Sequence, residues 1–183
     1  MTNLHTHENH LHLSEPRWFA IYTPYKREKH VNQLLVRKGI DAYVPLQTLT
    51  RRYTRKIKQV ELPLFNRYVF VKIVKGDYVK VLETEGVIQF VKIGGNLLSI
   101  PEEEISLIKR VIGESIPLNC TKPSYEVGDR VEIIAGNLTG IEGTLVKEEG
   151  KTQMLVDLHY LGYSLRIHID QSLLRMKDRS LVH

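Results

Sequence analysis

The sequence has only one cysteine and no hydrophobic run long enough to cross a bilayer. Because Cys120 is the only cysteine among 183 residues, no internal disulfide and no cysteine metal cluster can form. No apolar run approaches the roughly 18 residues of a membrane-spanning helix. The first residues are polar and contain His5, His7, His10 and His12, so the core of a signal peptide is missing. We therefore expect a cytoplasmic protein with no membrane contact, no metal and no other cofactor.

Positive charge is concentrated in the first part of the chain. Residues 16–113 contain 18 Lys/Arg and 9 Asp/Glu, a net charge of +9, whereas residues 124–177 contain 6 and 8, a net charge of −2. A basic segment is typical of a protein that lies close to a polyanion, and a slightly acidic one of a protein that meets another protein. A need for solubility alone would explain the same distribution. The charge pattern therefore does not decide between a functional role and simple solubility.

Strand and helix patterns alternate between residues 16 and 113. The apolar spacing predicts strands at 17–23, 41–46, 62–73 and 87–93, and helices at 26–38, 77–82 and 101–112. This order predicts an α+β domain, a ferredoxin-like α/β sandwich. Residues 1–15 have no period that builds a core, so we expect a disordered tail there, and residues 178–183 are expected to form a C-terminal tail.

Three glycines, Gly136, Gly140 and Gly143, stand between two strand-like segments in the last third of the chain. Glycine is needed where the backbone takes a positive φ or turns a sharp corner, so this spacing argues against a helix. Residues 114–123 contain two prolines and no periodicity, which is typical of a linker. Residues 124–177 carry only short strands, at the spacing of a small β-barrel.

The stretch from Tyr125 to Gly143 resembles the KOW motif, a small SH3-like β-barrel module of transcription and translation proteins. An α+β domain, a linker and a KOW barrel in this order resemble the NusG family of transcription elongation factors. The first strand, residues 18–22, and the segments 63–71 and 86–94 are similar to strands of the family's N-terminal domain. Asn66 departs from the proline that is usual there. The resemblance covers nearly the whole chain from Trp18 onward.

Proteins of this family bind RNA polymerase through an apolar concave face of the first domain, against the clamp helices of the largest subunit. Carried over by position, the resemblance implicates Tyr22, Phe65, Tyr68, Phe70 and Phe90. Side chains alternate along a strand, so Tyr68 and Phe70 point one way while the intervening valines point the other. We expect the valines to face the helices and the aromatic set to face a partner. The alternative is that the aromatic residues pack under the helices as core.

A basic run lies between two extended segments, and its cations are Arg51, Arg52, Arg55, Lys56 and Lys58. Contacts from such residues to phosphates release counterions and make binding sensitive to salt. A solvated hairpin tip is the alternative. The family resemblance implies that this run lies near upstream DNA. It also implies that Arg37 and Lys38, late in the first helix, match positions that read exposed non-template bases in specialised members.

The expected turn of a hairpin in the barrel contains Leu161, Gly162 and Tyr163. In general members of the family this turn has an aromatic residue before the glycine and a basic residue after it. There it contacts a small-subunit ribosomal protein or the termination factor Rho. Leucine and tyrosine replace those residues here, which argues against Rho and favours a specialised paralogue.

Asp157 and His159 could suggest a catalytic His-Asp pair, but no nucleophile or pocket signature accompanies them. The sequence therefore predicts a monomeric transcription antitermination or elongation factor that is not an enzyme. A ribosome-associated or RNA-binding KOW protein is the alternative.

Overall fold

The computed structural model describes residues 7–53, 56–114, 118–121, 128–148 and 151–177. The chain forms two compact units. The first comprises the described parts of Met1–Pro45 and Phe65–Ile105, and the second those of Leu46–Leu64 and Ser106–His183. The expected fold class, a mixed α/β chain with a β-rich C-terminal part, is confirmed. The expected domain boundaries at 113 and 124 stay a prediction.

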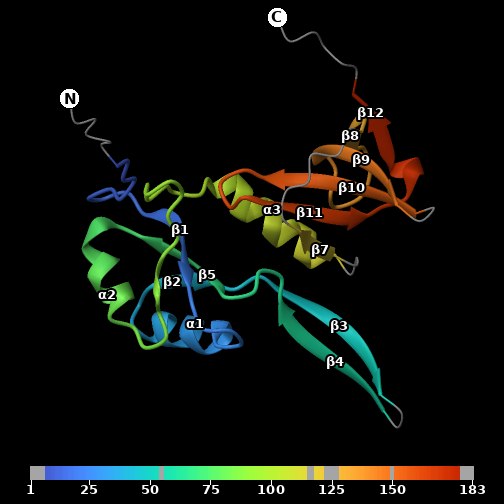
Figure 1. Cartoon of the computed structure of the whole chain (residues 1–183). Coiled ribbons are helices and arrows are strands. Elements are labelled where there is room, and N and C mark those ends of the chain that lie inside the picture. The colour runs from blue at the N-terminus through green and yellow to red at the C-terminus, as the bar shows by residue number, and fades with distance from the viewer. Residues whose placement is uncertain (1–6, 54–55, 115–117, 122–127, 149–150, 178–183) are drawn as a thin grey trace, which may run out of the picture. The chain divides into compact units, whose positions relative to one another are not determined.

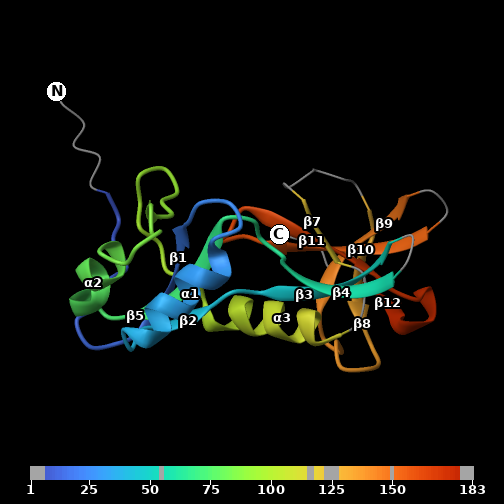
Figure 2. The same cartoon turned by 90° about the horizontal axis from the view of Figure 1, so that it is seen from below.

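The first unit is built on a four-stranded antiparallel sheet with the order β2-β5-β1-β6. Its elements are β1 (Arg17–Tyr22), α1 (Glu28–Arg37), β2 (Asp41–Tyr43), β5 (Tyr68–Ile73), η1 (Lys75–Asp77), α2 (Tyr78–Leu82), β6 (Gln89–Phe90) and the start of α3 (Glu102–Gly113). Strand β5 lies between β1 and β2, so the β1-α1-β2 connection is a split βαβ unit of the ferredoxin-like kind. Figure 2 shows α1 beside β2 and β5, the strands that it contacts.

One face of this sheet is apolar and buried. Phe19, Ile21, Val69 and Val71 are register partners in pairs across β1 and β5, and none of them is exposed to solvent. Helix α1 adds its buried Val31 and Leu35 to the core of this unit. Burial of such side chains stabilises the fold by about 1.5–3 kcal/mol each. Tyr68 and Phe70, on the other face of β5, are buried as well, so burial alone does not decide which face of β5 meets a partner.

The single tryptophan connects β1 and β5 to the start of α3. Trp18 Nε1 donates a hydrogen bond to Glu102 Oε2 at 2.8 Å, and Lys72 Nζ lies 2.9 Å from the same oxygen. The ammonium of Lys72 also lies 5.7 Å from the centre of the Trp18 ring. Because Trp18 is 3% exposed, its fluorescence is a sensitive report on the folding of this unit.

Strands β3 (Leu46–Tyr53) and β4 (Lys56–Pro63) form a long two-stranded ribbon, visible in both views (Figure 1, Figure 2). They pair antiparallel from Leu46↔Pro63 to Tyr53↔Lys56. The sequence predicted extended chain on both sides of the basic run, but it did not predict a ribbon of this length.

The rest of the second unit is a six-stranded antiparallel sheet with the order β12-β8-β9-β10-β11-β7. Its elements are β7 (Leu118–Thr121), β8 (Arg130–Ile133), β9 (Glu142–Glu148), β10 (Lys151–Leu158), β11 (Tyr163–His168), η2 (Gln171–Leu173) and β12 (Leu174–Met176). Strand β7 falls inside the segment expected to be an unstructured linker, and it pairs with β11. This corrects the linker prediction for those four residues. The hydrogen bonds of an edge strand come from the backbone, which side-chain periodicity does not reveal.

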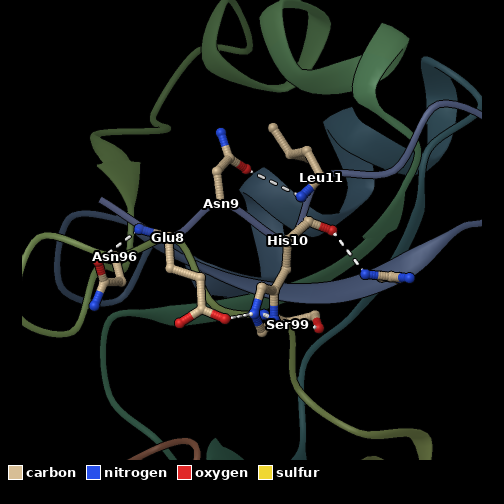
Figure 3. Close-up of polar contacts among 7 residues, drawn as sticks. Glu8, Asn9, His10, Leu11, Asn96 and Ser99 are labelled. Atoms are coloured by element: carbon tan, nitrogen blue, oxygen red, sulfur yellow. Dashed lines mark hydrogen bonds and ion pairs between the residues drawn. The ribbon is translucent and has the colours of Figure 1, made fainter. Parts of the chain in front are cut away.

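The N-terminal segment is ordered where it is described, so the expectation of a disordered tail is wrong for residues 7–15. The Leu97 N–H donates to the Glu8 carbonyl, and the His10 N–H donates to the Leu97 carbonyl, both at 2.9 Å. The Glu8 N–H donates to Asn96 Oδ1 at 2.8 Å, and the Ser99 N–H donates to His10 Nδ1 at 3.1 Å (Figure 3). These contacts use backbone and short polar groups rather than an apolar stripe, and for this reason the composition did not reveal them.

Among the described helices, none has the length and apolarity needed to cross a membrane.

Candidate functional site

Two tyrosines meet where β1 ends and β5 begins. Tyr22 and Tyr68 are register partners, with ring centroids 4.8 Å apart and hydroxyl oxygens 2.9 Å apart. Tyr22 is half-buried, whereas Tyr68 is 8% exposed. The Ile88 N–H donates to the Tyr22 carbonyl at 2.8 Å, and Gln89 is the register partner of Tyr22 on β6. We call Tyr22 and Tyr68 the tyrosine pair.

Two of the expected site residues are core residues in this structure. Phe65 is 3% exposed and Phe70 is not exposed. Their rings meet edge to face, with centroids 5.8 Å apart and an angle of 86° between the planes. Tyr43 lies on the other flank of Phe70, with a centroid distance of 6.4 Å. These two phenylalanines are therefore buried packing residues and do not form an open surface.

Phe90 does not share a sheet face with Tyr68 and Phe70. It is the register partner of Ile21, which pairs with Val69, so Phe90 lies on the same face as the valines of β5. Its ring stacks on Tyr78 of α2 at 4.7 Å and meets Phe19 edge to face at 6.2 Å. The expectation that all five aromatic residues share one face is corrected here. The face of Phe90 depends on the register between β1 and β6, which a single strand pattern does not contain.

The turn before Tyr68 contains a residue in an unusual conformation, which sequence reasoning missed. Arg67 has a φ of 70°, in the left-handed region. Its N–H donates to the Glu28 carboxylate at 2.7 Å, and its carbonyl accepts from the Thr23 N–H at 2.8 Å. Glu28 is 2% exposed and Thr23 is not exposed. The only signal in the sequence was the departure at Asn66, which indicated an altered turn.

The cations of the basic run lie on both faces of the β3–β4 ribbon. Arg51 and Lys58 are register partners, and Arg52 pairs with Ile57 on the opposite face. Arg51, Arg52 and Lys58 are all exposed. Like charges directly opposite each other destabilise a strand pair, so an anion bound to Arg51 and Lys58 would relieve this repulsion. Lys56 is the register partner of Tyr53, and Arg55 lies outside the described residues.

Arg37 and Lys38 stand at the end of α1, where both are exposed. Lys38 Nζ donates to the carbonyl of Glu83 at 3.2 Å and lies 3.5 Å from that of Lys80. A cation at these carbonyls satisfies groups at the C-terminal end of α2. Lys38 thus has a structural role in this unit, whereas Arg37 is exposed at the end of α1.

The three glycines that the sequence singled out, Gly136, Gly140 and Gly143, occupy positions that a side chain would disturb. Gly136 and Gly140 have φ values of 81° and 86° in the loop between β8 and β9. A Cβ on Gly143 would lie 2.3 Å from the carbonyl oxygen of Leu155 on β10. In the same unit the Arg110 guanidinium donates to the carbonyls of Asn137 and Thr139, both at 2.9 Å.

The expected hairpin turn joins β10 to β11. The N–H groups of Leu161 and Gly162 donate to the Leu158 carbonyl at 3.2 and 3.0 Å, and Gly162 has a φ of 64°. Tyr163 begins β11 as the register partner of Leu158. Tyr160 in the same turn is 44% exposed, and sequence reasoning missed it as a candidate contact residue.

The polar residues near this turn include Asp157 and His159, which the sequence offered as a His-Asp pair. Asp157 is the register partner of Ser164 and accepts a hydrogen bond from its hydroxyl at 2.6 Å. His159 lies beyond the end of β10. Across the described ranges, no three His, Cys, Asp or Glu side chains gather as metal ligands would.

The chain matches a known protein family and solved structures. Residues 16–109, slightly more than half of the 183, match the family model of the transcription termination factor NusG. A solved structure on domain interaction in Thermotoga maritima NusG aligns with a TM-score of 0.55 and 20% identity, covering 88% of this chain and 97% of that one. The MjSpt4:Spt5 complex in conformation A gives a TM-score of 0.31 at 19% identity, covering 87% of this chain and 97% of that one, too low a score to establish a common fold. The chain belongs to the NusG family of transcription factors.

Proposed function

We propose that this protein is a transcription antitermination or elongation factor that binds RNA polymerase through its first unit, at the clamp helices of the largest subunit. The observation that carries the proposal is the tyrosine pair, in which Tyr22 is half-buried at the end of β1. Tyrosines are frequent in the energetic centres of interfaces, because they bury a large area at a low cost in conformational entropy.

The proposed effect on transcription follows from preferential binding. A factor that binds the closed, processive state of the polymerase clamp more tightly than the open state shifts the equilibrium toward the closed state. Pausing and termination that require the open state then become less frequent. No reaction is catalysed by the factor in this scheme.

The β3–β4 ribbon is proposed to contact upstream or non-template DNA. Its support is the exposed, in-register pair Arg51 and Lys58, together with Arg52 on the other face. Arg37, at the end of α1, is a second candidate contact to bases. Lys38 is the weaker candidate because its ammonium already binds the end of α2.

The β-rich part of the second unit is proposed to be a KOW domain that recruits another protein through Leu161, Gly162 and Tyr163. The glycine loop with positive φ at Gly136 and Gly140 supports this assignment. A small-subunit ribosomal protein is the proposed partner. The leucine and tyrosine of this turn argue against Rho and favour a specialised paralogue over the general factor.

Copurification tests the proposal against its alternative, a ribosome-associated or RNA-binding protein. Tagged full-length protein is isolated from cells in moderate and in high salt, and both the polymerase subunits and ribosomal RNA are quantified. We expect polymerase to remain bound in both. Recovery of ribosomal RNA without polymerase, lost at high salt because phosphate contacts are screened, would favour the RNA-binding alternative.

A further inference from the structure

Arg67 has a side chain where the backbone favours glycine. Its φ of 70° lies in the left-handed region, which residues with a Cβ rarely adopt because the Cβ approaches the following carbonyl oxygen. Glycine takes this conformation without that clash. Such outliers persist where surrounding structure enforces them, and they concentrate at functional sites.

Two buried groups hold the backbone of Arg67 in place. Glu28 Oε1 accepts from the Arg67 N–H at 2.7 Å, and the Thr23 N–H donates to the Arg67 carbonyl at 2.8 Å. A carboxylate as buried as that of Glu28, at 2% exposure, is costly unless it is hydrogen-bonded. The two contacts together fix both the N–H and the carbonyl of one residue, so the turn is preformed before any partner binds.

The side chain of Arg67 is exposed immediately before Tyr68 in the chain. Its Nε lies 3.4 Å from the Thr23 carbonyl, which leaves the outer nitrogens of the guanidinium available to an acceptor. Arg67 is next to the tyrosine pair, because Tyr68 follows it in the chain and Tyr22 precedes Thr23, whose carbonyl Arg67 contacts. Aromatic residues with an arginine at their edge are typical of a protein interface, in which both are enriched.

We propose that Arg67 is a preformed cationic contact at the edge of the tyrosine pair, held by Glu28 and Thr23, and that it pairs with a carboxylate on the protein surface that binds this pair. The inference rests on the proposed function, because the binding surface is that of RNA polymerase. In this scheme Arg67 is a contact residue and Glu28 is a positioning residue.

The test compares four full-length proteins: wild type, Arg67→Gly, Arg67→Lys and Glu28→Ala. Arg67→Gly keeps the left-handed turn and removes the cation, so the protein should fold at least as well as wild type. We expect its affinity for purified core polymerase to fall about tenfold and its binding to depend less on salt. Arg67→Lys, which keeps the charge and loses the planar fork, should lie between the two.

Glu28→Ala provides the second arm. It should weaken polymerase binding in the wild-type background, but it should cause little further loss in the Arg67→Gly background, because both changes act on the same contact. A second measurement needs no polymerase. The amide proton of Arg67 should exchange slowly with solvent in wild type and faster in Glu28→Ala.

The outcomes separate this inference from the proposed function. If Tyr22→Ala loses polymerase binding while Arg67→Gly binds like wild type, the proposed function stands and the role of Arg67 is overturned. If Arg67→Gly weakens binding to DNA or RNA but not to polymerase, the class of partner is wrong. If wild type does not bind polymerase, both proposals fall, and the amide exchange still decides whether Glu28 holds the turn.

Discussion

Tyr43, at the end of β2, is a titratable residue whose environment changes its acidity. Partial burial beside Phe70 raises its pKa to about 12, because the charged phenolate is poorly solvated there. The folded-state value lies above the ordinary value of about 10, so folding favours the neutral phenol. The resulting stabilisation is present below pH 10 and is lost as the pH rises through about 12.

We therefore expect the free energy of unfolding to decline between pH 10 and pH 11.5, and the Tyr43→Phe variant to decline less steeply because it has no hydroxyl to ionise. Urea unfolding followed by Trp18 fluorescence at several pH values measures both slopes. Parallel slopes in the two proteins would show that Tyr43 does not carry this dependence.

At the same scale, the sequence predicted the alternation along β5 but not the partners across the sheet. Val69 and Val71 are buried, but so are Tyr68 and Phe70, which alternate with them, so the expected division of β5 into a core face and a partner face stays a prediction. The predicted face of Phe90 was wrong, because the side on which Phe90 lies depends on its pairing with Ile21, a residue far away in the chain. Glu28 was not predicted as a site residue either, since a glutamate in the first turn of a helix is common for electrostatic reasons alone.

At the scale of elements, the N-terminal segment pairs with Leu97 through backbone hydrogen bonds and with Asn96 and Ser99 through bonds that involve side chains. His10 contributes through Nδ1, which accepts from the Ser99 N–H at 3.1 Å. Its Nε2 lies 2.7 Å from the Glu8 carboxylate (Figure 3). The composition of this segment predicted disorder, because a low apolar content says nothing about hydrogen bonds made by the backbone.

The His10→Ala variant should expose the Ser99 amide. Loss of one hydrogen bond costs about 1.4 kcal/mol, so we expect this amide to exchange about tenfold faster with solvent. His30→Ala, which changes an exposed histidine on α1, is the matched control and should leave the exchange unchanged. Equal exchange in His10→Ala and wild type would show that the ring does not hold the segment.

The β3–β4 ribbon yields a prediction of opposite effects on stability and binding. Replacing both Arg51 and Lys58 with alanine removes two like charges that are register partners, so the ribbon should become no less stable. Binding to DNA should weaken. The slope of log K against log salt concentration should become shallower by about 0.9 for each lost phosphate contact on duplex DNA, or about 0.7 on a single strand.

The Lys75→Ala/Lys92→Ala variant, which removes two exposed cations elsewhere, is the control for the change in net charge. A slope that changes equally in this control and in Arg51→Ala/Lys58→Ala would mean that overall charge, and not the ribbon, governs DNA binding.

At the scale of the whole molecule, the order of elements was largely predictable from the sequence and the contacts between distant segments were not. Apolar spacing located α1 and β5, and the glycines at 136 and 140 located a loop of the second unit. Strand β7 and the pairing of the β3–β4 ribbon were missed, because both depend on backbone partners supplied by other parts of the chain. The tyrosine pair likewise required the register of β1 with β5.

The central claim is that the tyrosine pair binds RNA polymerase, and equilibrium binding of the full-length protein to purified core polymerase tests it most directly. Wild type is compared with Tyr22→Ala and with Tyr25→Ala, a control that removes a tyrosine that is 61% exposed and outside the pair. Trp18 fluorescence verifies that each protein is folded. We expect Tyr22→Ala to lose about 30-fold in affinity, the roughly 2 kcal/mol of an interface hot spot, and Tyr25→Ala to bind like wild type. Equal affinity of Tyr22→Ala and wild type, with both folded, would contradict the claim.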